Sequence, residues 1–349
     1  MIFDSSIFFV VMLLCFISTI LATSTVLFFN LFSNIKDIPN KRSLHNEVKP
    51  KFGGIIFMTI ILIFWLVSDF LVPPEISTFY LSLITISLMA VSLLDDVKST
   101  SALVRIIFHS ILVLFFILNI NLDLNLLYMC CIFILMVWMT NLFNFMDGSD
   151  GLASGMAVIG FGSYFIASFI AGNLNFAIKN GIISACSLGF LCFNFPPAKV
   201  FMGDVGSISL GFLSGAIGII GWEKEIWPFW FPLIVFSPFI ADSTVTLVKR
   251  IIKKEKFWEA HREHYYQRLI LLGWSHKKTA IILYLVMIFL VLISLYSLNN
   301  IGNECCKIYS LNSITIFIII IFISYAISAI NIDKRWKNFI ENKKGVRER

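Results

Sequence analysis

Four oxygen-bearing side chains recur at every third position near the middle of the chain: Asn141, Asn144, Asp147 and Asp150. Residues three apart are neighbours on a helical surface, so this spacing brings the four side chains together. A glycine follows each aspartate and lets the backbone leave the helix and approach a ligand. Amide and carboxylate oxygens suit Mg²⁺, which commonly takes one or two carboxylates together with substrate phosphates. The series therefore indicates a site for a phosphate compound and a metal ion.

A single aspartate, Asp204, stands between Gly203 and Gly206 directly before a later apolar stretch. A lone carboxylate at the start of a membrane helix is poorly explained as a residue that improves solubility, so a functional role is one interpretation. A helix N-cap is the alternative. Together with the asparagine and aspartate series, Asp204 can hold one metal ion with ligands from two helix ends. Lys199, a few residues upstream, is a further candidate for substrate binding.

Two adjacent carboxylates, Asp95 and Asp96, follow another apolar stretch and precede Lys98. Adjacent carboxylates repel each other, so such a pair usually has a cation nearby or one raised pKa. The pair can bind a metal ion or accept a proton from an incoming nucleophile. Solvated loop charge is the alternative interpretation.

The segment from Asp37 to His45, continued by Lys49, Lys51 and a pair of glycines, is rich in cations. Lys and Arg bind phosphate, and helix N-termini favour anions. The glycine pair, Gly53-Gly54, begins the next apolar stretch, so phosphate binding at this helix start is one hypothesis. A positively charged anchor beside an ordinary helix start is the other.

A late polar segment crowds His261, Arg262, His264 and Gln267 into a few residues. These side chains offer cationic and hydrogen-bonding contacts to an anionic substrate. His-x-x-His without a nearby cysteine or third histidine is weak support for zinc. An amphipathic helix at the membrane surface is the alternative.

The elements that position these residues are membrane-spanning helices. The chain has 349 residues, of which 58% are hydrophobic and 14% charged, which excludes a soluble globular protein, a disordered chain and a disulfide-stapled module. A spanning helix needs about 20 mostly apolar residues. We predict an all-α integral membrane protein, a polytopic bundle forming a single domain over 1–349, with eleven spans and ten as the alternative. The spans lie near 7–29, 55–71, 77–94, 103–119, 125–143, 153–171, 177–193, 206–221, 227–247, 280–298 and 311–330.

The Lys and Arg residues predict the orientation. All 27 except Lys179, Lys224 and Lys307 fall in the segments that lie inside when the N-terminus is outside, and cytoplasmic loops are enriched in these residues. These segments are 30–54, 95–105, 144–152, 194–205, 248–279 and 331–349. The N-terminus has no basic residue before its apolar run and does not resemble a cleavable signal. We therefore expect a periplasmic N-terminus, and a C-terminus and polar clusters in the cytoplasm.

The positive net charge of +6 thus reflects topology, and nucleic acid is not an expected partner. Segment 248–279 is expected to be a substrate-recognition loop and 331–349 a basic tail. No charge falls near the middle of a predicted span, whereas a carrier usually needs a polar site at that depth. An enzyme at the inner membrane surface is therefore favoured, with a nucleotide-sugar or lipid-linked-sugar transporter as the alternative. Most of the seven cysteines suit apolar packing; Cys305 and Cys306 lie in a predicted outside loop.

With its motifs in order over residues 37–268, the sequence resembles the polyprenyl-phosphate N-acetylhexosamine-1-phosphate transferases, glycosyltransferase family 4. This family includes the phospho-N-acetylmuramoyl-pentapeptide transferases, the undecaprenyl-phosphate GlcNAc-1-phosphate transferases and the eukaryotic dolichyl-phosphate enzyme. The resemblance is carried by the Pro39…His45…Gly53-Gly54 loop, Asp95-Asp96, Asn141-x-x-Asn144-x-x-Asp147-Gly-x-Asp150-Gly-Leu, Phe201-Met-Gly-Asp204-x-Gly-Ser and the late His/Arg loop.

The resemblance implies a fold of ten or eleven helices around a cytoplasm-facing cleft, and a reaction. A phosphate oxygen of polyprenyl phosphate attacks the β-phosphorus of a UDP-N-acetylhexosamine, and UMP leaves. Direct attack is favoured over a covalent phospho-aspartate. Membrane lipid is a further partner, and a homodimer is allowed.

The resemblance also implies residue roles. Asp204 and Asn144 coordinate Mg²⁺, with Mn²⁺ as the alternative ion. Asp95 or Asp96 deprotonates or positions the lipid phosphate, helped by Lys98. The donor is bound by residues from several motifs: Asn141, Asp147 and Asp150 (which faces the uracil), His45, Lys199, His261, Arg262 and His264.

The late loop departs from the histidine run of the muramoyl-pentapeptide branch. Its sequence, His261-Arg262-Glu263-His264, resembles the branch that starts O-antigen or other surface-polysaccharide repeats at the bacterial inner membrane. A peptidoglycan role is therefore in doubt, and the donor sugar stays open between GlcNAc and forms such as N-acetylfucosamine or N-acetylquinovosamine.

Overall fold

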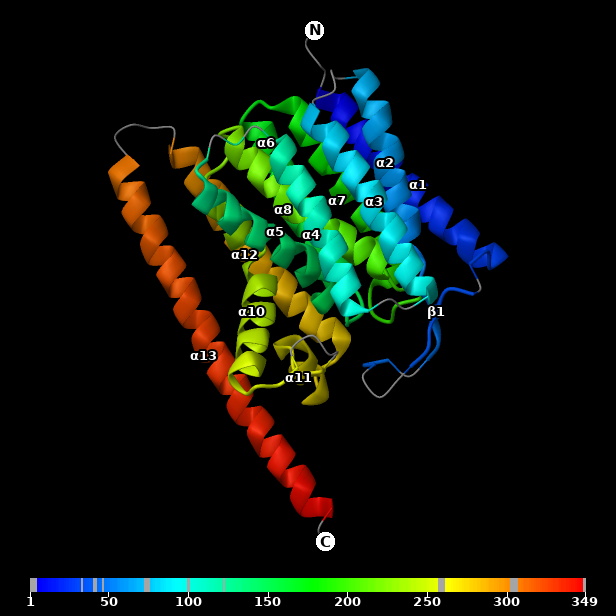
Figure 1. Cartoon of the computed structure of the whole chain (residues 1–349), viewed down its shortest axis with the longest axis vertical. Coiled ribbons are helices and arrows are strands. Elements are labelled where there is room, and N and C mark those ends of the chain that lie inside the picture. The colour runs from blue at the N-terminus through cyan, green and yellow to red at the C-terminus, as the bar shows by residue number, and fades with distance from the viewer. Residues whose placement is uncertain are drawn as a thin grey trace.

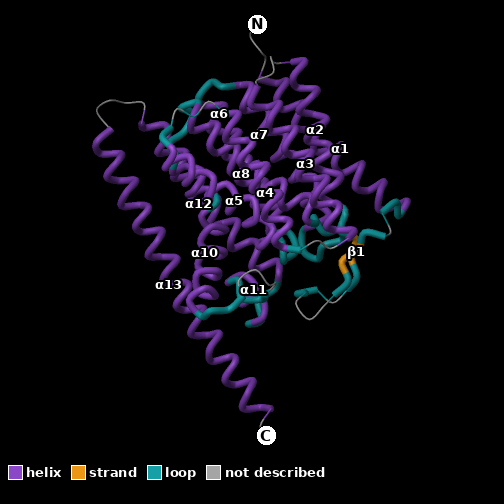
Figure 2. The backbone as a smooth tube through the Cα atoms, viewed as in Figure 1, coloured by secondary structure: helices purple, strands orange, loops and turns teal. Residues whose placement is uncertain are grey.

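The computed structural model describes residues 5–32, 34–39, 43–45, 47–71, 76–98, 101–120, 122, 124–256, 261–301 and 307–347. Nearly all of this part of the chain is helical (Figure 2). Ten of its helices are long and apolar enough to cross a membrane, which confirms the prediction of an all-α polytopic membrane protein. A two-residue antiparallel ladder, β1 (Lys36–Asp37) with β2 (Lys49–Pro50), was not predicted.

The helices follow the predicted spans closely and extend several of them. They are α1 (Ser5–Phe29), α2 (Gly53–Leu71), α3 (Ile76–Lys98), α4 (Ala102–Asn119), α5 (Leu126–Met146), α6 (Leu152–Ile170), α7 (Leu174–Asn194), α8 (Asp204–Glu223), α9 (Trp230–Val235), α10 (Ser237–Ile252), α11 (Tyr265–Leu271), α12 (His276–Ile301) and α13 (Lys307–Arg347).

Helix α8 lies at the centre of the bundle, in contact with α2, α3, α5 and α6 (Figure 1). Its small residues permit this position. A Cβ atom added at Gly211 would lie 2.6 Å from the carbonyl oxygens of Met139 and Thr140 on α5, so only glycine allows the two backbones to approach this closely. The last turn of α5 and the first turn of α8 are therefore held side by side at one end of the bundle.

We call this end of the bundle, where α3, α5 and α7 end and α2, α4, α6 and α8 begin, the site end. The extra helical turns at this end matter for the polar motifs. The Asp95-Asp96 pair belongs to the last turn of α3, and Asn141 and Asn144 belong to α5. Helices, not loops, therefore position these side chains.

The predicted ninth span, 227–247, is not a single helix. It is divided at Phe236 into α9 and α10. Pro238 has no amide hydrogen and cannot donate to the carbonyl oxygen of Ile234, as a continuous helix would require. The hydroxyl of Ser237 donates to that oxygen instead, at 2.7 Å, and satisfies it at the break.

The last part of the chain differs from the prediction in two further ways. The predicted loop 248–279 contains the last turn of α10, the short helix α11 and the first turn of α12, and the predicted basic tail 331–349 continues α13 as far as Arg347. Helix α13 runs along one side of the molecule, largely apart from the main bundle, and its final part extends beyond the site end (Figure 1). Cys305 and Cys306 lie outside the described residues.

Candidate active site

Three aspartates from two distant motifs meet at the site end. Asp95 and Asp96 come from the end of α3, and Asp204 is the first residue of α8. Lys51 joins two of them, with its Nζ 2.7 Å from Asp96 Oδ1 and 3.2 Å from Asp204 Oδ1. Arg105 joins Asp95 to the same Asp204, with its Nη1 2.8 Å from Asp95 Oδ2 and 3.3 Å from Asp204 Oδ2. We call these five residues the acid cluster.

Backbone hydrogen bonds between the segment before α2 and the segment before α8 place Lys51 in this cluster. Phe201 N donates to Pro50 O at 2.8 Å, and Gly53 N donates to Phe201 O at 3.0 Å. Gly54 N donates to Met202 O at 2.7 Å. A Cβ atom at Gly54 would lie 2.3 Å from the backbone nitrogen of Gly206, so the glycine pair lets the start of α2 press against the start of α8.

This packing corrects one hypothesis drawn from the sequence. The first two amides of α2, which the helix N-terminus would offer to a phosphate, already donate to Phe201 O and Met202 O. The glycine pair therefore allows the start of α2 to pack against the start of α8. This packing places Lys51, not the helix N-terminus, in the site.

The asparagine and aspartate series runs along the end of α5 as its spacing predicts, but the side chains divide into two groups. Asn141 Oδ1 lies 3.2 Å from Nδ1 of the buried His109 on α4, while Asn144 Oδ1 accepts from Ser207 Oγ at 3.2 Å. Ser207 is three residues after Asp204 on α8, so Asn144 lies beside the start of α8. Asp147 and the residues after it line a cavity instead.

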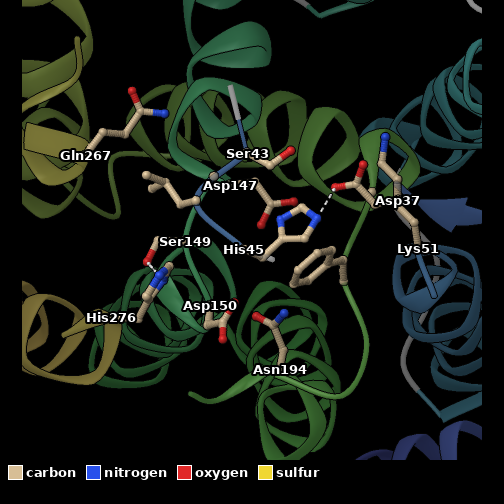
Figure 3. Close-up of a pocket in the computed structure, with 14 residues that line it drawn as sticks. Asp37, Ser43, His45, Lys51, Asp147, Ser149, Asp150, Asn194, Gln267 and His276 are labelled. Carbon is tan, nitrogen blue, oxygen red and sulfur yellow. Dashed lines mark hydrogen bonds and ion pairs between the residues drawn. The ribbon is translucent and has the colours of Figure 1, made fainter. Parts of the chain in front are cut away.

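The cavity has a volume of about 140 Å³ and lies beside the acid cluster. Its walls carry polar side chains from almost every motif (Figure 3). The lining residues are Asp37, Ser43, Leu44, His45, Lys51, Asp147, Gly148, Ser149, Asp150, Asn194, Phe201, Gly203, Gln267 and His276. His45, Asp147 and Asp150 are thus brought together as predicted, and Lys51 connects the cavity to the acid cluster.

Asp150 and Asn194 form the part of the wall where α6 begins and α7 ends. Asp150 Oδ2 accepts from Ala198 N at 2.9 Å and lies 4.0 Å from Lys49 Nζ. Asn194 Oδ1 accepts from Gly151 N at 3.1 Å. Both side chains fasten the loops around the cavity, and Asp150 in addition holds a cation at its edge.

Burial and charge shift the protonation of two lining residues. Burial raises the pKa of Asp147 well above its usual range; Lys51 opposes this shift, and the carboxylate of Asp204 adds to it. Burial alone would lower the pKa of Lys51, but Asp204 and Asp96 raise it above its usual range. Lys51 is therefore a permanent cation, and a cation bound next to Asp147 would favour its ionised form and release a proton.

The late His/Arg segment reaches the site through different contacts. Arg262 donates to the backbone oxygen of Ser43 at 2.6 Å, which fastens the first loop over the cavity. His264 is buried, with Nδ1 3.2 Å from Asp242 Oδ1. The ring of His261 stacks on that of His264 at 4.9 Å, and burial, with the charges of His264 and Arg250, lowers the pKa of His261 to about 4.

Other predicted residues lie apart from the cavity. The side chains of Lys98 and Lys199 are exposed, and neither lines the cavity. Asn141, His261 and His264 also lie outside its lining. The structure brings Arg262 to the cavity only through the loop that it holds.

Several residues of the site were missed from the sequence. Arg105 is one of them, and its position ten residues after Asp95 is the only signal of a shared role in the sequence. His276 begins α12 with Nδ1 2.9 Å from Ser149 Oγ. Nothing in its spacing indicates this contact, because it depends on how α12 returns to the bundle. Gln267, which the sequence places in the late polar segment, does line the cavity.

The donor set of the acid cluster fits Mg²⁺ better than zinc. An ionised carboxylate has about four acceptor positions, so Asp204 can bind a metal ion in addition to its two cations, and Asn144 offers an amide oxygen nearby. Among the described residues no three His, Cys, Asp or Glu side chains form a metal-binding group. The same finding leaves the His-x-x-His zinc alternative without a third ligand among the described residues.

Comparisons with known proteins agree with this arrangement. Residues 78–222 match the family described as Glycosyl transferase family 4. The chain is 28% identical over 301 residues to a probable undecaprenyl-phosphate N-acetylglucosaminyl 1-phosphate transferase of Bacillus subtilis, covering 82% of each chain. It is 27% identical over 277 residues to a phospho-N-acetylmuramoyl-pentapeptide-transferase of Anoxybacillus flavithermus, covering 71% of this chain and 83% of the relative. The enzyme of that name from Rickettsia prowazekii is 33% identical over 202 residues, covering 52% and 54%.

Proposed function

The chain belongs to glycosyl transferase family 4 as a multi-pass membrane polyprenyl-phosphate sugar-1-phosphate transferase, and on that premise we propose its substrates. The donor is a UDP-N-acetylhexosamine and the acceptor is undecaprenyl phosphate. The new bond joins an acceptor phosphate oxygen to the β-phosphorus of the donor. The bond from that phosphorus to the oxygen bridging the α-phosphate breaks, and UMP leaves. The product is undecaprenyl-diphospho-N-acetylhexosamine.

The observation that carries this proposal is the acid cluster beside a polar cavity. Two phosphate groups repel each other, so the site must supply positive charge and alignment. Lys51 and Arg105 supply fixed positive charge, and each already bridges two carboxylates of the cluster. Asp96, the least exposed acid of the cluster, keeps Lys51 aimed at the reacting groups, and Asp95 does the same for Arg105.

We assign Mg²⁺ to Asp204 and Asn144, with Mn²⁺ as the alternative ion. When bound, the metal ion neutralises phosphate charge and polarises the β-phosphorus. Asp147, on the cavity side, gives up its proton as positive charge arrives. Asp150 and the lining polar groups hold the nucleotide and sugar away from bulk water.

The lipid acceptor has an apolar groove of its own. A groove of about 370 Å³ lies between α5 and α10, and it is lined by Trp138, Ile240, Thr244, Leu247, Val248 and Ile251. Trp138 is one turn before Asn141 on α5, so the groove leads toward the polar motifs. An isoprenoid tail fits such a surface because burying hydrocarbon is favourable.

The orientation and pathway follow from the same proposal. From the basic segments at the site end we infer a cavity that faces the cytoplasm, where UDP-sugars are made. The His261-Arg262-Glu263-His264 segment favours initiation of a surface polysaccharide such as O-antigen. GlcNAc and its deoxy relatives are the donors to be compared.

The test is a transfer assay in membranes that contain the chain, supplied with undecaprenyl phosphate, Mg²⁺ and a panel of radiolabelled UDP-N-acetylhexosamines. We expect lipid-linked sugar and an equal amount of UMP from at least one donor, and none after chelation of Mg²⁺. Turnover by no donor would contradict the proposal. Intact donor accumulating inside sealed vesicles would instead identify a transporter.

The matched variant is Asp204→Asn, which keeps the shape of the side chain and removes its charge. It should lower transfer by about a thousandfold, because Lys51 and Arg105 lose their shared partner and the metal ion loses a ligand. The amount of protein in the membrane should not change. Retained activity would refute the role of Asp204.

A further inference from the structure

The last helix, α13, is attached to the rest of the chain at two places. In the first, Phe317, Ile318 and Tyr325 pack around an apolar group that contains Ile321, the only buried residue of α13 among those described. In the second, three turns further along, Asp333 meets α10 and α11. The rest of α13 has few contacts with the chain, so the second attachment is a localised one.

Asp333 is the centre of a polar clamp. Its Oδ1 accepts from Arg268 Nη1 at 2.7 Å. Its Oδ2 accepts from Lys249 Nζ and, at 3.3 Å, from the hydroxyl of Tyr265. The guanidinium of Arg268 also lies over the ring of Trp336, one turn further along α13, at 5.7 Å. Three side chains of α10 and α11 thus converge on one carboxylate.

Loss of the Asp333 carboxylate should destabilise Arg268 more than it would a surface arginine. Its side chain is only 7% exposed, and its other ion pair, with Glu263, is long at 3.7 Å. A buried charge that loses its partner is strongly destabilising. Removing the carboxylate of Asp333 therefore favours movement of Arg268, and of the helix that carries it, toward solvent.

Helix α11 carries the clamp on one face and the cavity on the other. Gln267, beside Arg268, lines the cavity (Figure 3). Tyr266 donates from its hydroxyl to Phe145 O at 3.0 Å, two residues before Asp147. A Cβ atom at Gly148 would lie 2.3 Å from the hydroxyl of Tyr266. A shift of α11 would therefore change the cavity wall directly.

We propose that Asp333 is a positioning residue for the donor site: through Arg268 it holds α11 so that Gln267 and Tyr266 complete the cavity wall. The inference rests on the proposed function for its effect on turnover. It adds a role for the last helix, which lies outside the resemblance to the family motifs. Asp333 itself does not touch the substrate.

The test compares Asp333→Asn with a matched control, Glu341→Gln. The control removes the same charge from the same helix, where Glu341 has only an exposed pair with Lys337 at 3.9 Å. In the full-length protein we expect Asp333→Asn to raise the donor KM about tenfold, as a small displacement of a binding wall does, with a smaller change in kcat. The KM of the lipid acceptor should stay the same. Asp333→Glu should restore most of the donor KM.

Hydrogen–deuterium exchange gives a second readout that needs no turnover. Amide exchange in 265–271 should be faster in Asp333→Asn than in Glu341→Gln and the unchanged chain, with equal exchange in α8. The inference is overturned if exchange in 265–271 is the same in both variants, or if it rises while the donor KM does not. Absence of transfer by the unchanged chain would refute the proposed function alone, because the exchange result still decides whether Asp333 holds α11.

Discussion

Two groups of paired charges lie at opposite ends of α2. At the site end, Lys51 precedes the helix and bridges Asp96 and Asp204. At the other end, about 24 Å away at 1.5 Å per residue, Asp69 pairs with the buried Lys179 of α7. Both lysines are held by carboxylates, yet only one of them borders a cavity.

The difference lies in how completely the charges are matched. Among the described residues, Lys179 meets the carboxylate of Asp69. It also donates to the backbone oxygen of Trp65 at 2.8 Å, while Trp65 Nε1 donates to Lys179 O at 3.0 Å. These two described charges are equal and opposite. The acid cluster has three carboxylates and two cations, so it is one positive charge short. A neutral ion pair is typical of a structural role. An excess of negative charge beside a cavity is typical of a site that binds a cation.

Neutralising each lysine in turn tests whether Lys51 serves the site and Lys179 the scaffold. Lys51→Met should reduce transfer by about a hundredfold, because the two phosphates lose a fixed cation, and it should also lower the melting temperature, because the buried Asp96 loses its partner. Lys179→Met should lower the melting temperature of the detergent-solubilised protein with near-normal kcat, because Asp69 loses its partner. Transfer assays and thermal unfolding of both variants are the measurement. Equal loss of activity in the two variants would show that charge balance does not separate site from scaffold.

A smaller effect is expected from the packing that delivers Lys51. Gly54→Ala places a Cβ atom against the backbone of Gly206, where neither backbone can yield cheaply, so α2 and α8 must separate and Lys51 shifts from Asp204. We expect about a tenfold loss of transfer. Gly162→Ala on α6, where the nearest atom is Ser184 Oγ at 3.3 Å, is the control. Normal activity in Gly54→Ala would mean that a shift of Lys51 away from Asp204 does not impair transfer.

The smallest expected effect concerns His261 and pH. Its pKa is lowered to about 4 by burial and by the neighbouring charges of His264 and Arg250, whereas an unfolded histidine titrates near 6.5. Between these values the unfolded chain binds the extra proton, so this group's contribution to stability is present above about 6.5 and is lost as pH falls toward 4. His261→Gln should flatten the fall of melting temperature with pH over this range. If the melting temperature of His261→Gln falls with pH as steeply as that of the unchanged chain, the lowered pKa of His261 is contradicted.

Sequence reasoning predicted most of the fold, because the length of an apolar span depends on the membrane and not on packing. The break at Phe236 was missed because proline can stand in the first turn of a helix as well as interrupt one. The continuation of α13 was missed because charged residues after an apolar span look the same in a helix and in a loose tail.

The site was predicted in part. Asp95, Asp96 and Asp204 meet as expected, because helix ends at one membrane face are brought together by the bundle itself. Which cation meets which acid was not predictable, since Lys51 is placed by backbone bonds between segments about 150 residues apart in sequence, a separation that no local pattern records. His264 illustrates the opposite limit: its type suits catalysis, but its buried ring lies outside the lining of the cavity.

The central position of α8 has a consequence for the order in which the protein is assembled during synthesis. Four of its neighbours, α2, α3, α5 and α6, precede it in the chain, so they have left the ribosome before α8 does. Every member of the acid cluster likewise lies at or before residue 204. Helix α8 therefore enters a space that its neighbours have already outlined, and the acid cluster can form while the clamp at Asp333 is still unmade. The acid cluster is therefore complete in the chain before the residues of α11 and α12 that finish the cavity wall.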